Sequence, residues 1–206
     1  MVVLLAIIVQ QVGPMVIAGQ RVTGTSDVGS IRAFYGHQSL QLFWGLSGIG
    51  FVALVFFAVS FRAYLRTFPL SAIESLALDC GTAAMLLEAP LIAVEIALQA
   101  ALVQTVASGT DNGVLALFAG WDWIYNGSTY ALETTWMAVW AFLGLRTSAL
   151  PKWVVVAGAA AALGLLFNST VLTFRVPDSY TLIPTALLAA WMVGALTHLA
   201  RGGTQN

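Results

Sequence analysis

The chain has 206 residues, of which 59% are hydrophobic and only 8% are charged, and its net charge is −1. Soluble domains contain about 45–50% apolar residues, so this composition excludes an ordinary soluble domain. The near-neutral charge, without any basic run, excludes a nucleic-acid partner. A single cysteine, Cys80, excludes an internal disulfide. We therefore expect an integral membrane protein whose main partner is the lipid bilayer.

Apolar runs recur along the whole chain, and each has about the 20 residues that a helix needs to cross a hydrocarbon core of roughly 30 Å. We predict an all-α, polytopic transmembrane helical bundle that forms a single integral membrane domain over residues 1–206. The six expected spans are Val2–Ala18, Leu40–Phe61, Leu76–Ala107, Trp123–Leu145, Lys152–Phe174 and Thr181–Leu199.

Three segments of the predicted six-span topology need a separate interpretation. Val2–Ala18 has the length of a signal-peptide core, but no basic residue precedes it and its last three residues, Val16–Ala18, form a poor cleavage site, so we interpret it as a retained helix. The polar segment Gly19–Gln38 is expected to be a loop, either a plain connector or a lid. Pro90 lies near the middle of the long third span, where we expect a kink or a strong tilt.

The basic residues predict the orientation. One side of the bundle would carry five of them and the other side three, so the positive-inside rule places both termini in the cytoplasm. The five are Arg62, Arg66, Arg146, Lys152 and Arg201, and the three are Arg21, Arg32 and Arg175.

Three stretches resemble a known family. They are RTSALPKWVVVAGAAAALG at Arg146–Gly164, YGHQSLQLFWGLSGIG at Tyr35–Gly50 and ALLAAWMVGALTHLARG at Ala186–Gly202. Together they resemble an uncharacterised family of bacterial integral membrane proteins, described from sequence as six-helix and known only as a domain of unknown function. The resemblance implies the six-span topology and a multi-pass location in the bacterial cytoplasmic membrane. It implies no catalytic residue, because none is established for that family.

Polar residues within the fourth span fall on one face of a helix. Their spacing alternates between three and four residues, which is the repeat of a helical face. They are Asp122, Asn126, Thr129, Glu133, Trp136 and Trp140. In the third span, Glu88, Glu95 and Gln99 are spaced by seven and four residues, again on one face. The two spans are consecutive and antiparallel, so we expect them to pack together and to bring the three glutamates to a similar depth.

No lysine or arginine is expected at that depth. A charged carboxylate at the bilayer centre costs about 2.5–3.5 kcal/mol on insertion scales, and three would repel one another. We therefore expect that at least two of the three are protonated or that they hold a cation, as at many functional sites. The candidate proton donors or anchors are Glu133, Glu88 and Glu95, and the candidate ligand-binding residues are Asp122, Asn126, Tyr130, Trp136, Trp140 and Gln99.

Other chemistries find little support in the sequence. His37 and His198 are expected at opposite ends of the bundle, so one metal ion cannot bind both, and we predict no metal site and no cofactor. A site made only of carboxylates suits hard cations, which leaves Ca²⁺, Mg²⁺ or Na⁺ open. No GxSxG motif is present, and no histidine lies at a matching depth to act as a base. Gly81, Gly158 and Gly164 are expected at helix-packing positions.

Three functions remain open. The first is a buried carboxylate and aromatic cavity that binds or protonates a lipophilic small molecule. The second is a small proton- or cation-coupled carrier, and because such carriers often dimerise, a homo-oligomer stays open. The third is a non-catalytic membrane scaffold or partner subunit in which the acids hold helices together. We favour the first because the polar stripe is rich in aromatic residues and does not continue beyond Trp140. The sequence leaves open whether any reaction is catalysed.

Overall fold

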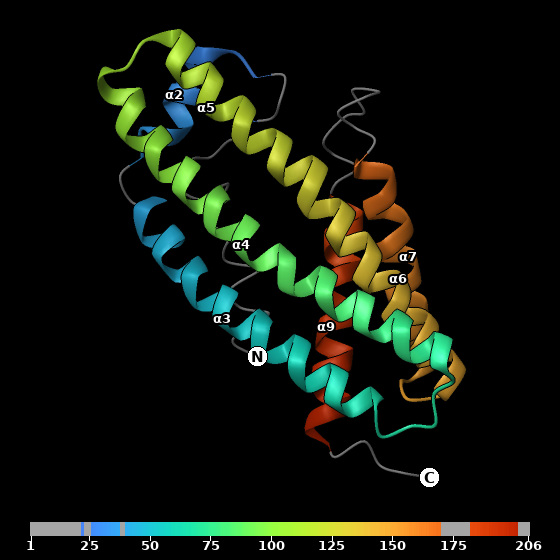
Figure 1. Cartoon of the computed structure of the whole chain (residues 1–206). Helices are drawn as coiled ribbons and strands as arrows, with labels where there is room; N and C mark the ends of the chain where they lie inside the picture. The colour runs from blue at the N-terminus through green and yellow to red at the C-terminus, as the bar shows by residue number, and fades with distance from the viewer. Residues whose placement is uncertain (1–21, 23–25, 38–39, 170–181, 202–206) are drawn as a thin grey trace.

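The computed structural model describes residues 22, 26–37, 40–169 and 182–201, with the side chains of residues 40–51 and 182 excepted. All regular structure in these residues is helical, and they include no strand (Figure 1). The expectation of an all-α protein is thus confirmed. The predicted first span, Val2–Ala18, lies outside the described residues.

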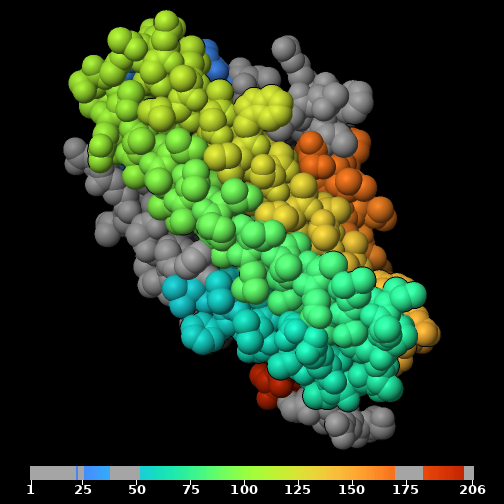
Figure 2. All heavy atoms as spheres, viewed as in Figure 1, coloured from blue at the N-terminus to red at the C-terminus, as the bar shows by residue number. Residues whose placement is uncertain are grey.

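The described residues form five long helical segments that lie side by side. Helix α4 (Ala72–Ser108) lies between α3 (Leu40–Leu65) and α6 (Tyr130–Thr147), and α7 (Lys152–Ser169) lies between α6 and α9 (Leu182–Ala200). In Figure 2 the side chains of α4 lie between the described part of α3 and the helical segment that precedes and includes α6. The expected packing of the third span against the fourth is therefore present.

Three of these helices are long and apolar enough to cross a membrane: α4, α7 and the segment Ile183–Ala200 of α9. A shorter apolar segment, Val52–Leu65, belongs to α3. These helices support a membrane protein. The six-span arrangement and the sidedness of the termini remain predictions from the sequence.

Helix α4 begins earlier than hydropathy predicted, at Ala72 rather than Leu76. Ser71 and Glu74 form a capping box, in which the Ser71 amide donates to Glu74 Oε2 at 2.9 Å and the Glu74 amide donates to Ser71 Oγ at 3.3 Å. The helix runs without interruption through Pro90, so this proline does not divide the span. Polar capping residues lower the local hydropathy, which is why the apolar pattern alone starts the helix too late.

The segment before the fourth predicted span is helical as well. Helix α5 (Asp111–Trp123) is followed directly by a π-helical turn, η1 (Ile124–Thr129), and then by α6. The boundary predicted at Trp123 therefore falls inside one continuous helical path that starts at Asp111. Thr110 Oγ1 caps this path by accepting a hydrogen bond from the Gly113 amide at 3.2 Å.

The segment expected to be a loop contains helix α2 (Val28–Tyr35). Asp27 caps it, because Asp27 Oδ1 accepts a hydrogen bond from the Ser30 amide at 2.9 Å. Ile31, Phe34 and Tyr35 are buried and pack against α4 and α5. Figure 1 shows α2 beside α5 at one end of the bundle, which we call the α2 end.

The opposite end, which we call the basic end, holds the α3–α4 turn, the α6–α7 turn and the end of α9 (Figure 1). Tyr64 connects all three, because its hydroxyl donates to the Ala149 carbonyl at 2.8 Å and lies 3.2 Å from His198 Nε2. The five basic residues that the sequence assigned to one side all belong to segments at this end: Arg62, Arg66, Arg146, Lys152 and Arg201. Arg62 and Arg66 both bind Asp79, at 2.8 and 3.0 Å.

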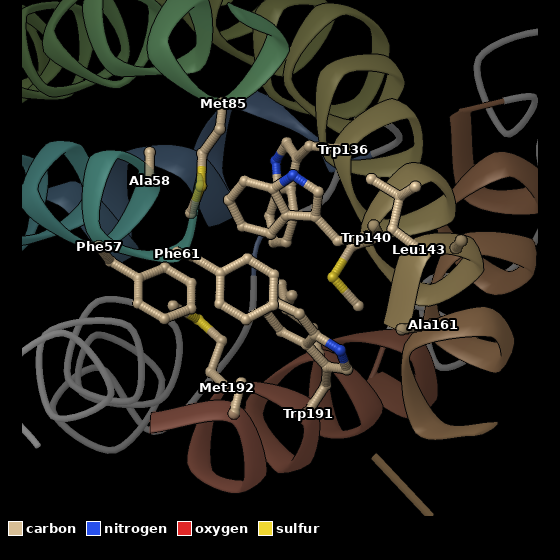
Figure 3. Packing of buried hydrophobic residues seen from close by; sticks show 14 of the residues in the cluster. Phe57, Ala58, Phe61, Met85, Trp136, Trp140, Leu143, Ala161, Trp191 and Met192 are labelled. Atoms are coloured by element: carbon tan, nitrogen blue, oxygen red, sulfur yellow. The ribbon is translucent and has the colours of Figure 1, made fainter. Parts of the chain in front are cut away.

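A packed core with an aromatic centre joins α3, α4, α6, α7 and α9 (Figure 3). Phe61 of α3, Trp136 and Trp140 of α6 and Trp191 of α9 are fully buried, and the Phe61 and Trp140 rings lie 4.7 Å apart. Met85 of α4 points into the same cluster (Figure 3). Burying several large rings makes this the main apolar contact of the bundle.

Glycines allow the close helix contacts around this core, as predicted for Gly81, Gly158 and Gly164. A Cβ atom on Gly158 would lie only 2.7 Å from Trp191 Cδ1, and one on Gly164 would lie 2.8 Å from Pro184 Cβ. The α7–α9 contact therefore depends on small residues, as is common between transmembrane helices.

Candidate functional site

The α4–α6 interface brings the three predicted glutamates together. Glu88 and Glu95 on α4 are only 4% and 2% exposed. Trp136 Nε1 donates to Glu88 Oε2 at 2.7 Å, and Thr129 Oγ1 donates to Glu95 Oε1 at 2.5 Å. Each carboxyl is therefore held by a side chain of the neighbouring helical path.

Glu133 of α6 completes the group. Its carboxyl is hydrogen-bonded to the carboxyl of Glu88, and both interact electrostatically with Glu95. The second oxygen of Glu133, Oε2, is buried and has no hydrogen-bond partner. We call Glu88 and Glu133 the carboxyl pair.

No basic group neutralises the carboxyl pair within the part of the chain that the structure describes. The ion pairs found there lie at the helix ends and join Arg32 to Asp111, Arg62 and Arg66 to Asp79, and Arg146 to Glu74. The same residues contain no group of three or more His, Cys, Asp or Glu side chains arranged to hold a metal ion. A proton on one of the carboxyls would limit the charge that is buried there.

The π-helical turn η1 changes the predicted polar stripe. A π turn inserts residues into the α-helical repeat, so the face before it does not continue in simple register. Asp122 and Thr129 are buried, whereas Asn126 between them is only half-buried. Asn126 instead supports Asp122, because its Nδ2 donates to Asp122 Oδ1 at 2.7 Å.

A second polar group lies nearer the α2 end. Tyr35 of α2 is buried, the side chain of Gln99 is hydrogen-bonded to its hydroxyl, and the charge of Asp122 acts on it. Burial raises the pKa of the Tyr35 phenol, and the hydrogen bond from Gln99 opposes this shift. Gln99 Oε1 is buried and has no partner of its own.

Tyr35 was not predicted as a site residue, because the segment that carries it was expected to be a loop. A signal for it is present in the sequence. Asp27 is a good N-cap residue, and Ile31, Phe34 and Tyr35 follow at the spacing of one helical face. That pattern identifies a short amphipathic helix rather than a plain connector.

The predicted aromatic walls, Tyr130, Trp136 and Trp140, all belong to the packed core. The Trp136 and Trp140 rings lie 5.3 Å apart, and Trp140 lies 5.9 Å from Trp191 (Figure 3). The indole nitrogens of Trp140 and Trp191 are buried without hydrogen-bond partners. Trp140 and Trp191 form a tightly packed boundary on the basic side of the carboxyl pair, whereas Tyr130 lies on its α2 side, next to Tyr125.

An apolar groove of about 380 Å³ runs between α6 and α7. Its lining residues are Thr134, Ala138, Ala141, Phe142, Leu145, Val155, Ala159, Ala162, Leu163 and Leu166. Thr134 is its one hydroxyl-bearing residue, and that hydroxyl is buried without a hydrogen-bond partner. None of the three glutamates lines the groove, although Thr134 directly follows Glu133 in the chain.

Comparison of the chain with protein-family models, with curated proteins and with solved structures gave no match. The resemblance to a six-helix membrane family therefore stays a prediction, and the function has to be argued from the site.

Proposed function

We propose that this chain is a multi-pass membrane protein whose carboxyl pair holds a dissociable proton and donates it to a lipophilic small molecule. The observation that carries the proposal is the close approach of the Glu88 and Glu133 carboxyls at a place where no described ion pair supplies a basic partner. An ionised carboxyl group has acceptors but no donor. Two neighbouring carboxyls therefore form a hydrogen bond, instead of repelling each other, when one of them carries a proton.

The pattern of donors assigns the proton to Glu133. Trp136 Nε1 already donates to Glu88, so Glu88 accepts hydrogen bonds and Glu133 supplies the second one. Hydrogen bonds to an ionised acceptor are stronger than those to a neutral one. This arrangement leaves one buried negative charge on Glu88 and an acid on Glu133.

Glu133 also has an oxygen available for a ligand. Its Oε2 is buried without a partner, so a polar group of a bound molecule would gain a hydrogen bond there. In the proposed step the Glu133 hydroxyl leaves its hydrogen bond with Glu88, its O–H bond breaks, and the proton passes to a basic atom of the ligand. Glu133 is left as a carboxylate, and the protonated ligand supplies the positive charge that balances it. That is general acid catalysis, which fits protonation or isomerisation of a lipid-soluble molecule.

The groove between α6 and α7 supports an apolar ligand. Its volume of about 380 Å³ falls within the range of about 300–1,000 Å³ that is typical of small-molecule pockets. It ends at Thr134, one residue from Glu133 and on the adjoining face of α6. A hydrocarbon chain in the groove would place an attached polar group near the carboxyl pair.

A proton-coupled carrier is the second candidate. It is favoured by the polar side chains that continue from the carboxyl pair to the α2 end, because carriers use intramembrane carboxyls as coupling sites. A carrier would take up protons with its substrate in proteoliposomes and would lose this activity in Glu133→Gln.

Native mass spectrometry of detergent-purified protein tests the proposed function. We expect a discrete small-molecule adduct on the wild type that is missing from folded Glu133→Gln. The matched control is Glu74→Gln, which removes a carboxyl at the helix end, where Glu74 pairs with Arg146 at 3.2 Å, and should keep the adduct. Bare masses for all three proteins, with heterogeneous phospholipid only, would overturn the proposal and favour a scaffold held together by buried acids.

A further inference from the structure

Among the described residues, carboxyl and amide side chains continue from the carboxyl pair toward the α2 end. Toward the α2 end the next groups on α4 are Glu95, held by Thr129, and then Gln99. Tyr35 and Asp122 follow beside Gln99. These groups come from α2, α4 and the path through α5 and η1, so three separate segments contribute to one polar line.

The opposite direction is filled by aromatic packing, and its unpartnered polar atoms are the indole N–H donors of Trp140 and Trp191, which cannot accept a proton. Between the carboxyl pair and the basic end lie Trp140, Phe61 and Trp191, all fully buried. Thr82 is the buried hydroxyl of α4 on this side, and it donates to its own helix at Leu78 O at 2.8 Å. Among the side chains that the structure describes here, no carboxyl or amide continues the polar line.

Two buried acceptors without protein partners lie along the polar line. They are Glu133 Oε2, at the carboxyl pair, and Gln99 Oε1, between Glu95 and Tyr35. A buried acceptor left unpaired costs about 1–3 kcal/mol, and such groups are the usual partners of internal water. Glu88 and Glu95 are seven residues apart, or about 10 Å along a helix. A proton would therefore need bridging water to pass between them.

Helix α2 closes this line at its outer end. The Arg32 guanidinium binds Asp111 at 2.8 Å and donates to the Gly109 carbonyl at 2.7 Å and to the Val106 carbonyl. These contacts fasten α2 across the end of α4 and the start of α5. They hold Tyr35 over Gln99, so α2 covers the polar line rather than merely connecting two helices.

We infer that the carboxyl pair exchanges its proton with bulk water through Glu95, Gln99, Tyr35 and Asp122 at the α2 end, and that α2 limits this exchange. A proton from water binds to Asp122, or the Tyr35 hydroxyl relays it by accepting this proton while donating its own. The proton then passes to Glu95 and finally to the pair. Gln99 positions water and carries no charge itself. The inference rests on the proposed function, since it concerns the supply of the same proton.

Infrared spectroscopy of the purified protein during a change from H₂O to D₂O tests the route. The measured quantity is the rate at which the protonated-carboxyl C=O band shifts. We expect Gln99→Leu to slow this rate by about tenfold or more, equivalent to a barrier increase of about 1.4 kcal/mol, with unchanged initial band intensity. The matched control is Thr82→Val, which removes a buried hydroxyl of the same helix on the side filled by aromatic packing and should leave the rate at the wild-type value.

Two further variants keep the test decisive. Tyr35→Phe keeps the ring that packs on Phe118 at 6.3 Å and removes only the hydroxyl, so it should also slow exchange. Arg32→Gln loosens α2 and should accelerate exchange several-fold. An unchanged rate in both Gln99→Leu and Tyr35→Phe, or equal slowing in Thr82→Val, overturns the route. Absence of the band from the wild type would instead refute the proposed function.

Discussion

Replacing Glu88 by leucine removes the acceptor at the centre of the carboxyl site. Trp136 Nε1 loses its 2.7 Å hydrogen bond, and Glu133 loses the partner of its carboxyl. Each buried polar group left unsatisfied costs about 1–3 kcal/mol, so we expect the free energy of unfolding of Glu88→Leu to fall by about 2–6 kcal/mol, the sum for two groups.

Glu88→Gln is the matched comparison. Glutamine has the same shape, keeps an acceptor oxygen for Trp136, and can donate its amide to the carbonyl oxygen of Glu133. In the proposed arrangement Glu88 carries the single negative charge of the pair. Glutamine removes this charge but keeps both hydrogen bonds, so the free energy of unfolding should fall by less than about 1 kcal/mol, within the range of a single hydrogen bond.

Denaturant unfolding in detergent, followed by tryptophan fluorescence, measures both variants, since Trp136 lies in the site. Midpoints are compared at equal slopes to obtain the change in stability. A leucine variant as stable as the wild type would refute this prediction, because the two hydrogen bonds would then contribute nothing to stability. The prediction is refuted equally by a glutamine variant that loses as much stability as the leucine variant, because the charge of Glu88 would then be essential.

Three further predictions concern the helices that hold the site. Gly158→Ala should lower the free energy of unfolding by about 1–3 kcal/mol through overpacking, because the new Cβ would meet Trp191 at 2.7 Å. Gly120→Ala is the control. Nothing lies within 4 Å of its Cβ, so it should be neutral or stabilising in the same unfolding assay. Ser148 ends α6 with φ 54°, so Ser148→Gly should raise the unfolding midpoint by relieving about 1–2 kcal/mol of left-handed strain. Hydrogen bonds from Ser30 hold the pKa of Asp27 below its ordinary value of 3.8. The cap therefore stabilises α2 above that value and is lost as pH falls through the lower pKa, so hydrogen exchange of α2 amides should accelerate in acid in the wild type but change little with pH in Asp27→Asn.

Hydropathy predicted the helical class and most of the described apolar helices. The spacing of Glu88, Glu95 and Gln99 on one side and of Asp122, Thr129 and Trp136 on the other also indicated which faces of two neighbouring helices would meet. These features follow from local periodicity, which the sequence carries directly. The hydrogen bond between the carboxyls of Glu88 and Glu133 agrees with the expectation that the acids lie at one depth.

Structure that depends on caps and on tertiary contacts was missed. Helix α5 begins with Asp111 and contains Gly113 and Gly120, so its mean hydropathy is low, yet Thr110 caps it and its apolar side chains pack on α2. The π-helical turn was missed because periodicity analysis assumes a constant helical repeat. Asn126, inside that turn, is half-buried and stays beside the buried Asp122, to whose carboxyl it donates a hydrogen bond.

The most direct test of the central claim is the infrared spectrum of the wild type beside Glu133→Gln and Glu88→Gln at neutral pH. We expect a protonated-carboxyl C=O band in the wild type that is lost in Glu133→Gln, because Glu133 carries the shared proton. In Glu88→Gln the band should remain and shift, because Glu133 keeps its proton but gains an amide neighbour. A wild-type spectrum without this band, or one that Glu133→Gln leaves unaltered, would contradict the claim that the carboxyl pair stores a proton.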